Sequence, residues 1–362
     1  MMKNQVVMKF ISAIIEHDQM IVLACNLAGI FRVNLKNGYV ETLAALPQEY
    51  FSYNYMKMCK VDNKYYISPC HSDSIVEIDA NDWHDQYLYK IDDKQTEVKS
   101  IRCGDVYPVG SSVYFLPFGG HAIIELNRET RELQYYKQCF EYVSEIISVK
   151  PTLLFGGSVV EGDKIWFVCR QTNVVIGFDT KNKETECYIV GEDKIGFKSI
   201  CYAENYFWIY TVKGDLIQWN RSNGVKQILH ELGGDEPEDV DISFHNNKIV
   251  LAGQSMYHCI EVDVSSGECE KILFDRNNNE KKTYGFFTKI EDGLYFLPED
   301  NDYFYEIDTI NRSAYGRKIV LEGVELEKYR KLRIENDIRI KGFVMERENE
   351  TIDDFIKIIS NP

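Results

Sequence analysis

An acidic or amide residue at the end of a short apolar run recurs seven times along this chain of 362 residues, at intervals of 41 to 52 residues. In every copy the residues one and three places before it are apolar or aromatic, which is the period-2 alternation of a strand with a buried face. The seven closing residues are Asn34, Asp79, Asn127, Asp179, Asn220, Asp263 and Asp308. This pattern predicts a series of similar strand units.

Residues 163–184 show one unit in full. An apolar run over residues 165–168 is followed by a polar break, a second apolar run over residues 174–178, and a turn-like segment. Polar turn residues between β-branched and aromatic runs indicate hairpins. Repeats of about 40 to 50 residues made of short strands are typical of β-propellers. We therefore predict an all-β fold, a propeller of seven four-stranded blades within residues 1–323, with six blades as the alternative if the first or last unit is incomplete.

The third unit resembles a degenerate kelch repeat. Kelch repeats carry a Gly-Gly doublet at the end of the second strand, followed by an aromatic residue, a turn and a Trp. Gly119 and Gly120 match the doublet and residues 128–130 match the turn, while residues 133–136 stand where the Trp is expected. This resemblance implies the propeller fold and assigns no functional residue.

The pattern changes after residue 323. Apolar side chains spaced among charges over residues 324–334 predict a helix. Residues 351–354 have the spacing of a capping box before a last short helix. We predict residues 324–362 as a helical tail packed on the propeller, with docking on a partner as the alternative.

The charge of the chain restricts its partners. The net charge is −16 at pH 7, and such a surface repels phosphate backbones and anionic lipid headgroups. No run approaches the roughly 18 apolar residues of a membrane span. Lys9 interrupts the N-terminal apolar run, and acidic residues follow where a secretory signal would have its cleavage site. We predict neither nucleic acid nor membrane as a partner.

The cysteines predict a reducing compartment. The ten cysteines contain no CxxC pair and no zinc-ligand spacing, and several lie inside apolar strand runs. Reduced, buried thiols in a cytoplasmic protein explain this arrangement. Among the other strand residues, Trp166, Phe178 and Trp219 occupy alternating positions that predict burial between blades.

Propeller geometry predicts where a ligand binds. The first strand of each blade lines the central channel, and the loops between strands two and three share one face with the connections between blades. We call this the loop face. A basic cluster with aromatic neighbours at the channel mouth suits an anionic ligand, such as a carboxylated sugar or a carboxyl-terminal peptide. The predicted ligand-binding residues are Arg102, Arg170, Lys198, His71, His121, Phe155 and Phe197.

Other chemistries have less support in the sequence. Residues 70–73, Cys-His-Ser-Asp, have the residue types of a nucleophilic site, but neighbours in one loop rarely point at a common atom. His71, His121 and His258 occupy equivalent loops and would bind a metal only if they converged on the channel. The acidic residues 299–302 lack the Gly and the distant Glu of an EF-hand loop. We predict no metal and no cofactor.

Two functions from different classes remain open. The first is a non-catalytic cytoplasmic propeller that binds a protein partner or a small anionic ligand on its loop face. The alternative is a propeller enzyme, a lyase, epimerase or glycan-processing hydrolase, with its site at the central channel. The fold alone does not decide between them. A deep pocket with converging titratable groups favours the enzyme, and a shallow aromatic surface favours the binder.

Overall fold

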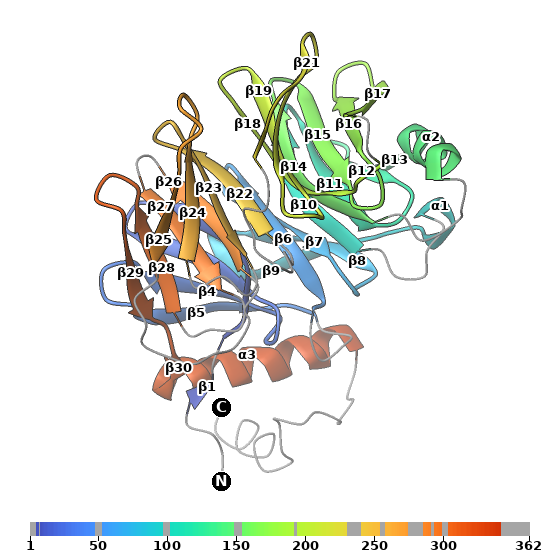
Figure 1. Cartoon of the computed structure of the whole chain (residues 1–362). Coiled ribbons are helices and arrows are strands. Elements are labelled where there is room, and N and C mark those ends of the chain that lie inside the picture. The colour runs from blue at the N-terminus through green and yellow to red at the C-terminus, as the bar shows by residue number, and fades with distance from the viewer. Residues whose placement is uncertain are drawn as a thin grey trace.

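The computed structural model describes most of the chain (Figure 1). Seven four-stranded antiparallel sheets stand around a common axis, and in each the strands follow one another in chain order from the inside to the outside. The described residues are 5–6, 8–47, 53–96, 102–147, 154–191, 194–229, 240–253, 258–273, 285–290, 293–298 and 303–341. The predicted fold class, a propeller of seven blades with a C-terminal helix, is confirmed.

Each blade contributes one strand to each of four concentric positions. The innermost strands are β2 (Phe10–Glu16), β6 (Tyr55–Val61), β10 (Arg102–Val109), β14 (Phe155–Glu161), β18 (Phe197–Ala203), β22 (Val240–His245) and β26 (Gly285–Ile290). The second strands are β3 (Gln19–Ala24), β7 (Lys64–Pro69), β11 (Ser112–Gly119), β15 (Lys164–Cys169), β19 (Tyr206–Thr211), β23 (Lys248–Gly253) and β27 (Gly293–Pro298). The third strands are β4 (Gly29–Asn34), β8 (Ser74–Asp79), β12 (Ile123–Asn127), β16 (Val174–Asp179), β20 (Leu216–Asn220), β24 (His258–Asp263) and β28 (Tyr303–Asp308). The outer strands are β5 (Val40–Ala45), β9 (Asp82–Lys90), β13 (Leu133–Tyr136), β17 (Thr185–Ile189), β21 (Gly224–Leu229), β25 (Cys269–Leu273) and β29 (Ser313–Lys318).

The repeated acid or amide is the last residue of the third strand in all seven blades. Its side-chain oxygen accepts backbone amides from the turn that follows, as Asp263 does from Ser265 and Ser266, each at 2.9 Å. Asn34 does the same for Lys36 and Asn37. A short polar side chain that satisfies the turn amides is the physical reason for the repeat.

The core is divided among the interfaces between blades. Seven clusters of buried apolar side chains each join two neighbouring blades. Trp166 and Phe178 are fully buried and Trp219 is 4% exposed, as the alternating pattern predicts. Burying one such side chain contributes roughly 1.5 to 3 kcal/mol, so most of the stability of each blade depends on its neighbours.

Two short helices lie in the connections between blades: α1 (Asp93–Thr96), which follows blade two, and α2 (Gln138–Ile147), which follows blade three. Cys139, Phe140 and Val143 are the buried residues of α2, and they join the core between blades three and four. The apolar stretch in this connection is therefore a small helix that extends a blade interface.

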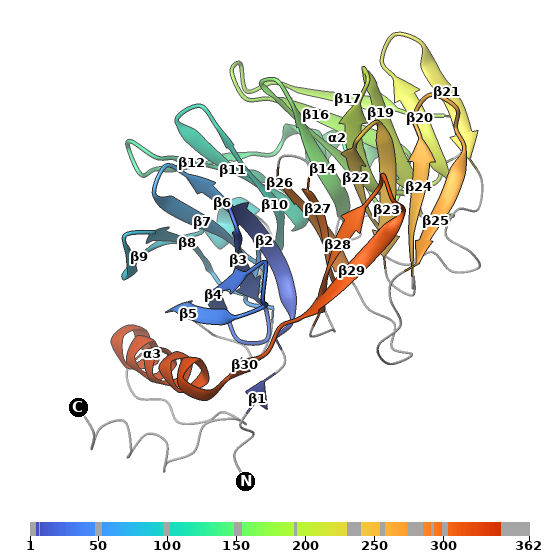
Figure 2. The same cartoon turned by 90° about the vertical axis from the view of Figure 1, so that its left-hand side faces the viewer.

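Blade seven meets blade one without exchanging a strand. All four strands of each of these blades are consecutive in the sequence. The ring is closed at the periphery by a two-stranded sheet in which β1 (Gln5–Val6) pairs with β30 (Leu321–Glu322). The helix α3 (Gly323–Lys341) follows β30 and lies along blade one (Figure 2).

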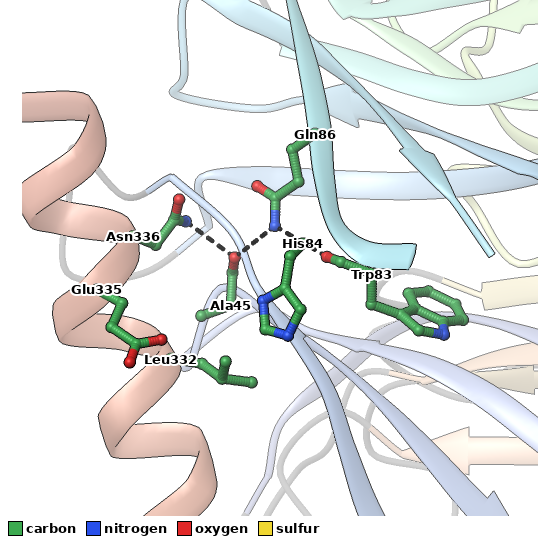
Figure 3. Close-up of a pocket in the computed structure, with 7 residues that line it drawn as sticks. All are labelled: Ala45, Trp83, His84, Gln86, Leu332, Glu335 and Asn336. Carbon is green, nitrogen blue, oxygen red and sulfur yellow. Dashed lines mark hydrogen bonds between the residues drawn. The ribbon is translucent and has the colours of Figure 1, made fainter. Parts of the chain in front are cut away.

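Hydrogen bonds from three positions along α3 fix the helix to blade one. Glu325 accepts the backbone amide of Thr42 in β5 at 2.6 Å, so the helix covers part of the outer edge of that blade. The Tyr329 hydroxyl donates to the Leu27 carbonyl. Asn336 donates to the Ala45 carbonyl at 2.9 Å (Figure 3). The tail residues 342–362, including the predicted capping box, lie outside the described residues.

Candidate functional site in the central channel

The innermost strands are irregular near the loop face. In β2, β6, β10, β14 and β18 the pairing with the second strand shifts at the beginning of the strand. Such β-bulges take residues out of the ladder and redirect their side chains, and they are frequent beside active sites. The residues that lie between the paired positions are Ile11, Met56, Lys57, Gly104, Asp105, Gly156, Gly157 and Lys198.

A buried hydroxyl holds the bulges of blades two and three. The fully buried Ser68 accepts the Lys57 amide at 2.9 Å. Its hydroxyl lies 3.1 Å from the Lys57 carbonyl and 3.3 Å from the Gly104 carbonyl. These contacts replace ladder hydrogen bonds that the bulge removes. The backbones of Lys57 and Asp105 are therefore held at neighbouring positions in the channel wall.

Polar side chains from four blades extend into the channel at and beside these bulges. Asp105 accepts a hydrogen bond from the Ser158 hydroxyl. The Tyr107 hydroxyl donates to the Ser158 carbonyl at 2.9 Å. On blade six, Asp241 accepts the Phe287 amide of blade seven at 2.7 Å. The ammonium group of Lys57 lies 4.7 Å from the centre of the Phe286 ring.

The channel environment disfavours negative charge at Asp241. Burial raises the pKa of this carboxyl, and the nearby charge of Asp105 adds to the rise, against the opposing effects of Lys57 and the Phe287 amide. Burial and the charge of Asp105 likewise raise the pKa of Tyr107 well above its ordinary value. The Tyr107 hydroxyl is therefore a neutral donor, and the channel favours the neutral form of the Asp241 carboxyl.

The Gly156-Gly157 pair is required by the close approach of β14 and β18. A Cβ at Gly156 would lie 2.2 Å from the Lys198 carbonyl oxygen, and one at Gly157 would lie 3.2 Å from Ser199. Neither residue has a positive φ. The pair is thus explained by backbone contact between blades four and five, which positions the Lys198 bulge.

The predicted basic residues occupy separate places on the loop face. Lys198 is a bulge residue of β18. The Arg170 guanidinium lies 5.7 Å from the Phe118 ring of blade three. Arg102 begins β10, and its side chain lies outside the described residues. Arg170 thus reaches toward blade three, while Lys198 lies on the innermost strand.

The predicted histidines and aromatics also differ in their surroundings. The His121 ring is 6.3 Å from the Phe140 ring of α2, and the His71 amide donates to the Asn54 carbonyl at 3.3 Å. Phe155 and Phe197 are buried in the interfaces on either side of blade four. They therefore support the inner strands, and their rings present no open surface to a ligand.

A cavity lies away from the channel, between α3 and β9 (Figure 3). Its volume is about 180 Å³. The Gln86 amide donates to the carbonyls of Ala45 and Trp83, and the side chains of His84 and Glu335 extend into the space between the two elements (Figure 3). The cavity depends on the position of α3, because the helix forms one of its walls.

The comparisons with known proteins agree on the fold. No protein-family model matches the chain, and no curated protein is significantly similar to it. Virginiamycin B lyase from Staphylococcus aureus superposes with a TM-score of 0.63 at 9% identity, covering 82% of this chain and 95% of the lyase. BamB from Moraxella catarrhalis superposes at 0.51 with 13% identity over 80% of each chain. Hsv2 from Kluyveromyces lactis superposes at 0.51 with 10% identity, covering 86% of this chain and 98% of Hsv2.

These likenesses establish a β-propeller and no activity, because the identities are low. Among the described residues, no three His, Cys, Asp or Glu side chains form a group that could hold a metal ion, so His71, His121 and His258 do not make one. The acidic residues 299–302 lie outside the described part. No helix in the described ranges has the length and hydrophobicity that crossing a membrane requires.

Sequence reasoning missed Lys57, Asp105, Tyr107, Ser158 and Asp241. A bulge breaks the alternation that identifies a strand face, so the pattern gave no reason to direct Lys57 and Asp105 into the channel. The available signal was their position, since each lies near the beginning of an innermost strand. Aligning the seven units on their first strands would have placed them at equivalent positions.

Proposed function

We propose that the protein binds a small anionic ligand at the loop-face end of the central channel. The observation that carries this is Lys57. Its ammonium group is held over the Phe286 ring in the channel, and no ion pair joins it to any described residue. A half-buried cation beside an aromatic ring lies in a region of reduced dielectric, where an anionic group gains more than it would in water.

The remaining predicted residues extend this site outward. Lys198 lies on the innermost strand of blade five, and Arg170 and His121 are on loops of blades four and three. A cytoplasmic location is part of the proposal, since all ten cysteines are free thiols. The same loop face is the surface that a protein partner would use.

The proposal is tested by titrating the purified protein with simple carboxylates, sugar acids and amino acids by isothermal calorimetry. We expect Lys57→Met to weaken binding of any compound that binds at least tenfold. Lys60→Met is the matched control, because Lys60 is on the same strand but pairs with Glu16 at 2.7 Å. Equal affinity of the Lys57 variant and the control contradicts the proposal.

Arg170 tests the outer part of the site. Arg170→Ala should weaken binding at least tenfold with little change in melting temperature, since a charge-assisted contact to an anion is lost. The corresponding control is Arg317→Ala on the outer strand β29, which should leave binding unchanged. If Arg170→Ala binds as the unmodified protein does, the ligand is held by the channel wall alone.

A channel enzyme is the second candidate function. It is favoured by Asp241, a carboxyl whose pKa is raised by burial and is influenced by the charges of Lys57 and Asp105, because a perturbed carboxyl in a channel is a candidate for proton transfer. Metabolite profiling of a cell extract incubated with the protein, and with its Asp241→Asn variant, tests it. A compound consumed by the first and spared by the second supports catalysis, and identical profiles exclude it for that extract.

A further inference from the structure

The channel holds a cation and an anion on neighbouring strands that do not neutralise each other. Lys57 of β6 and Asp105 of β10 are both bulge residues, and the single hydroxyl of Ser68 contacts the carbonyls of Lys57 and Gly104. Their backbones are therefore close. Even so, the two described side chains form no ion pair with each other. Opposite charges on neighbouring strands that are not paired with each other are both available to a ligand.

Each of the two charges is held in place on one side and open on the other. The Ser158 hydroxyl occupies one oxygen of Asp105, and no described residue donates to the other oxygen. The Phe286 ring lies on one side of the Lys57 ammonium group, which has no hydrogen-bond acceptor among the described residues. A ligand can thus offer an acceptor to Lys57 and a donor to Asp105 at the same time.

The charges around the pair differ on its two sides. Asp241 lies close enough to Asp105 and to Lys57 that the charges of both influence the pKa of its carboxyl. The acidic side of the site therefore attracts a cationic donor more strongly than a neutral hydroxyl. The basic side requires an anion. One small molecule that meets both demands carries an ammonium group and a carboxylate on the same carbon atom.

We infer that the ligand of the channel is a zwitterion of the α-amino acid type, with its carboxylate on Lys57 and its ammonium group on Asp105. This inference rests on the proposed function, since it names the ligand class of the same site. It assigns Asp105, which the anionic-ligand proposal does not use, a direct part in recognition. It also explains why an acidic residue faces the site of an anion.

The experiment compares amino acids with derivatives that lack one charge. Calorimetric titrations use the twenty common amino acids, the N-acetyl derivative of each compound that binds, and its carboxamide. We expect at least one parent amino acid to bind and both of its derivatives to bind at least tenfold more weakly. Asp105→Asn should remove the discrimination against the N-acetyl derivative, and Lys57→Met the discrimination against the carboxamide. Lys60→Met should retain both.

The outcomes separate the two proposals. If N-acetyl amino acids or sugar acids bind as tightly as free amino acids, the site reads an anion only, so this inference is overturned and the proposed function stands. If no carboxylate of any kind binds, the proposed function itself fails. A melting temperature unchanged in Asp105→Asn shows that a lost discrimination reflects recognition and not unfolding. Unchanged discrimination in that folded variant also overturns the inference.

Discussion

At the scale of single residues, the turn after each third strand combines two requirements. Four residues after the closing acid or amide, the backbone adopts a positive φ wherever the turn has full length. Six blades have this turn. Three of them place Gly there, at Gly38, Gly224 and Gly267, and three place a cation, at Arg131, Lys183 and Arg312. The positive φ costs a side chain of this kind about 1 kcal/mol or more.

The cations offset that cost by contacting the preceding blade. Lys183 of blade four lies 2.8 Å from Glu125 of blade three, and Arg312 of blade seven lies 2.5 Å from Glu270 of blade six. Glu125 is buried, which opposes its charge, yet hydrogen bonds from Lys183 and from neighbouring hydroxyls hold its pKa below the ordinary value. A turn position that only Gly fits easily thus becomes a link between blades.

Asp263 makes one of these turns sensitive to acid. The Ser266 amide, then Lys248 and the Ser265 amide, lower the pKa of Asp263 to about 2. Because the folded pKa is below the unfolded value of about 3.9, the carboxylate stabilises the fold above that value, and this contribution is lost as the pH falls toward 2. We expect Asp263→Asn to lose less stability between pH 4 and pH 2 than the unmodified protein does.

The measurement is the denaturation midpoint in urea at several pH values. The control is Asn127→Asp in the equivalent turn of blade three, which already has a neutral amide accepting two turn amides. That change should introduce a new acid-dependent loss. Parallel pH curves for all three proteins contradict the role given to the carboxylate.

The buried aromatics provide a second prediction at this scale. Trp219 packs against Tyr188 and Phe207, with ring centres 5.4 and 5.3 Å away. Trp219→Ala should reduce the free energy of unfolding by about 3 to 5 kcal/mol. Tyr315→Ala, at a side chain that is 55% exposed, should cost far less. Chemical denaturation measures both, and a loss below about 1 kcal/mol at Trp219 would show that the side chain is not part of the core.

The sequence predicts some of these residues and not others. The closing residues and the apolar positions before them are visible because every unit repeats them. The position two before the closing residue does not belong to this apolar pattern, and it holds Glu77, Glu125, Glu261 and Glu306 in four blades. Those carboxylates are buried or half-buried and bound by Lys, Arg, Ser or Tyr, which no apolar periodicity reveals. The sequence predicts Phe155 and Phe197 as ligand-binding residues at the channel mouth, whereas the structure packs both between blades.

At the scale of elements, α3 contributes side chains to the seam between blades one and seven. Leu326 and Tyr329 of α3 join the same apolar cluster as residues of blades one and seven. The helical pattern of residues 324–334 predicted this element. Its partner surface was beyond prediction, since an amphipathic helix fits any apolar face of the right size.

The contribution of α3 is measurable. Leu326→Ala should cost about 2 to 5 kcal/mol, because it leaves a cavity in the cluster at the seam. Val324 lies two residues before Leu326 in the same helix and is 82% exposed. Val324→Ala should therefore change stability by less than about 0.5 kcal/mol. Denaturant unfolding of the two variants gives the values. Equal effects would mean that the helix rests on the blade without contributing to its core.

At the scale of the whole molecule, the folded ring buries most of the cysteine thiols. All ten cysteines are free, eight are buried, Cys187 is half-buried and Cys269 is exposed. Burial raises the pKa of most of these thiols, that of Cys187 to about 12. Thiol titration should find Cys269 reacting first in the native protein and close to ten thiols in denaturant. Eight or fewer thiols in unoxidised, denatured protein contradict this.

The architecture of the molecule was more predictable than its site for a physical reason. Blade number and strand order follow from a local pattern that is repeated seven times. An irregular copy therefore does not hide the pattern, because the other copies still show it. The channel site is assembled from single residues on four blades, and two of them, Lys57 and Asp105, are placed by bulges that interrupt the strand pattern. The kelch resemblance of the third unit marked a turn and contributed nothing to that convergence.

The uninterrupted blades have a consequence for synthesis. Since no blade combines strands from the two ends of the chain, each blade is complete as soon as its own residues have left the ribosome, and blades can pack in the order in which they emerge. The contacts within a blade are also close in sequence, which favours rapid formation. The seam between blades seven and one is different, because β30 and α3 are made after all seven blades. Until α3 is made, the apolar edge of blade one that it covers is exposed. A nascent chain paused before residue 323 is therefore the form that we expect chaperones to bind.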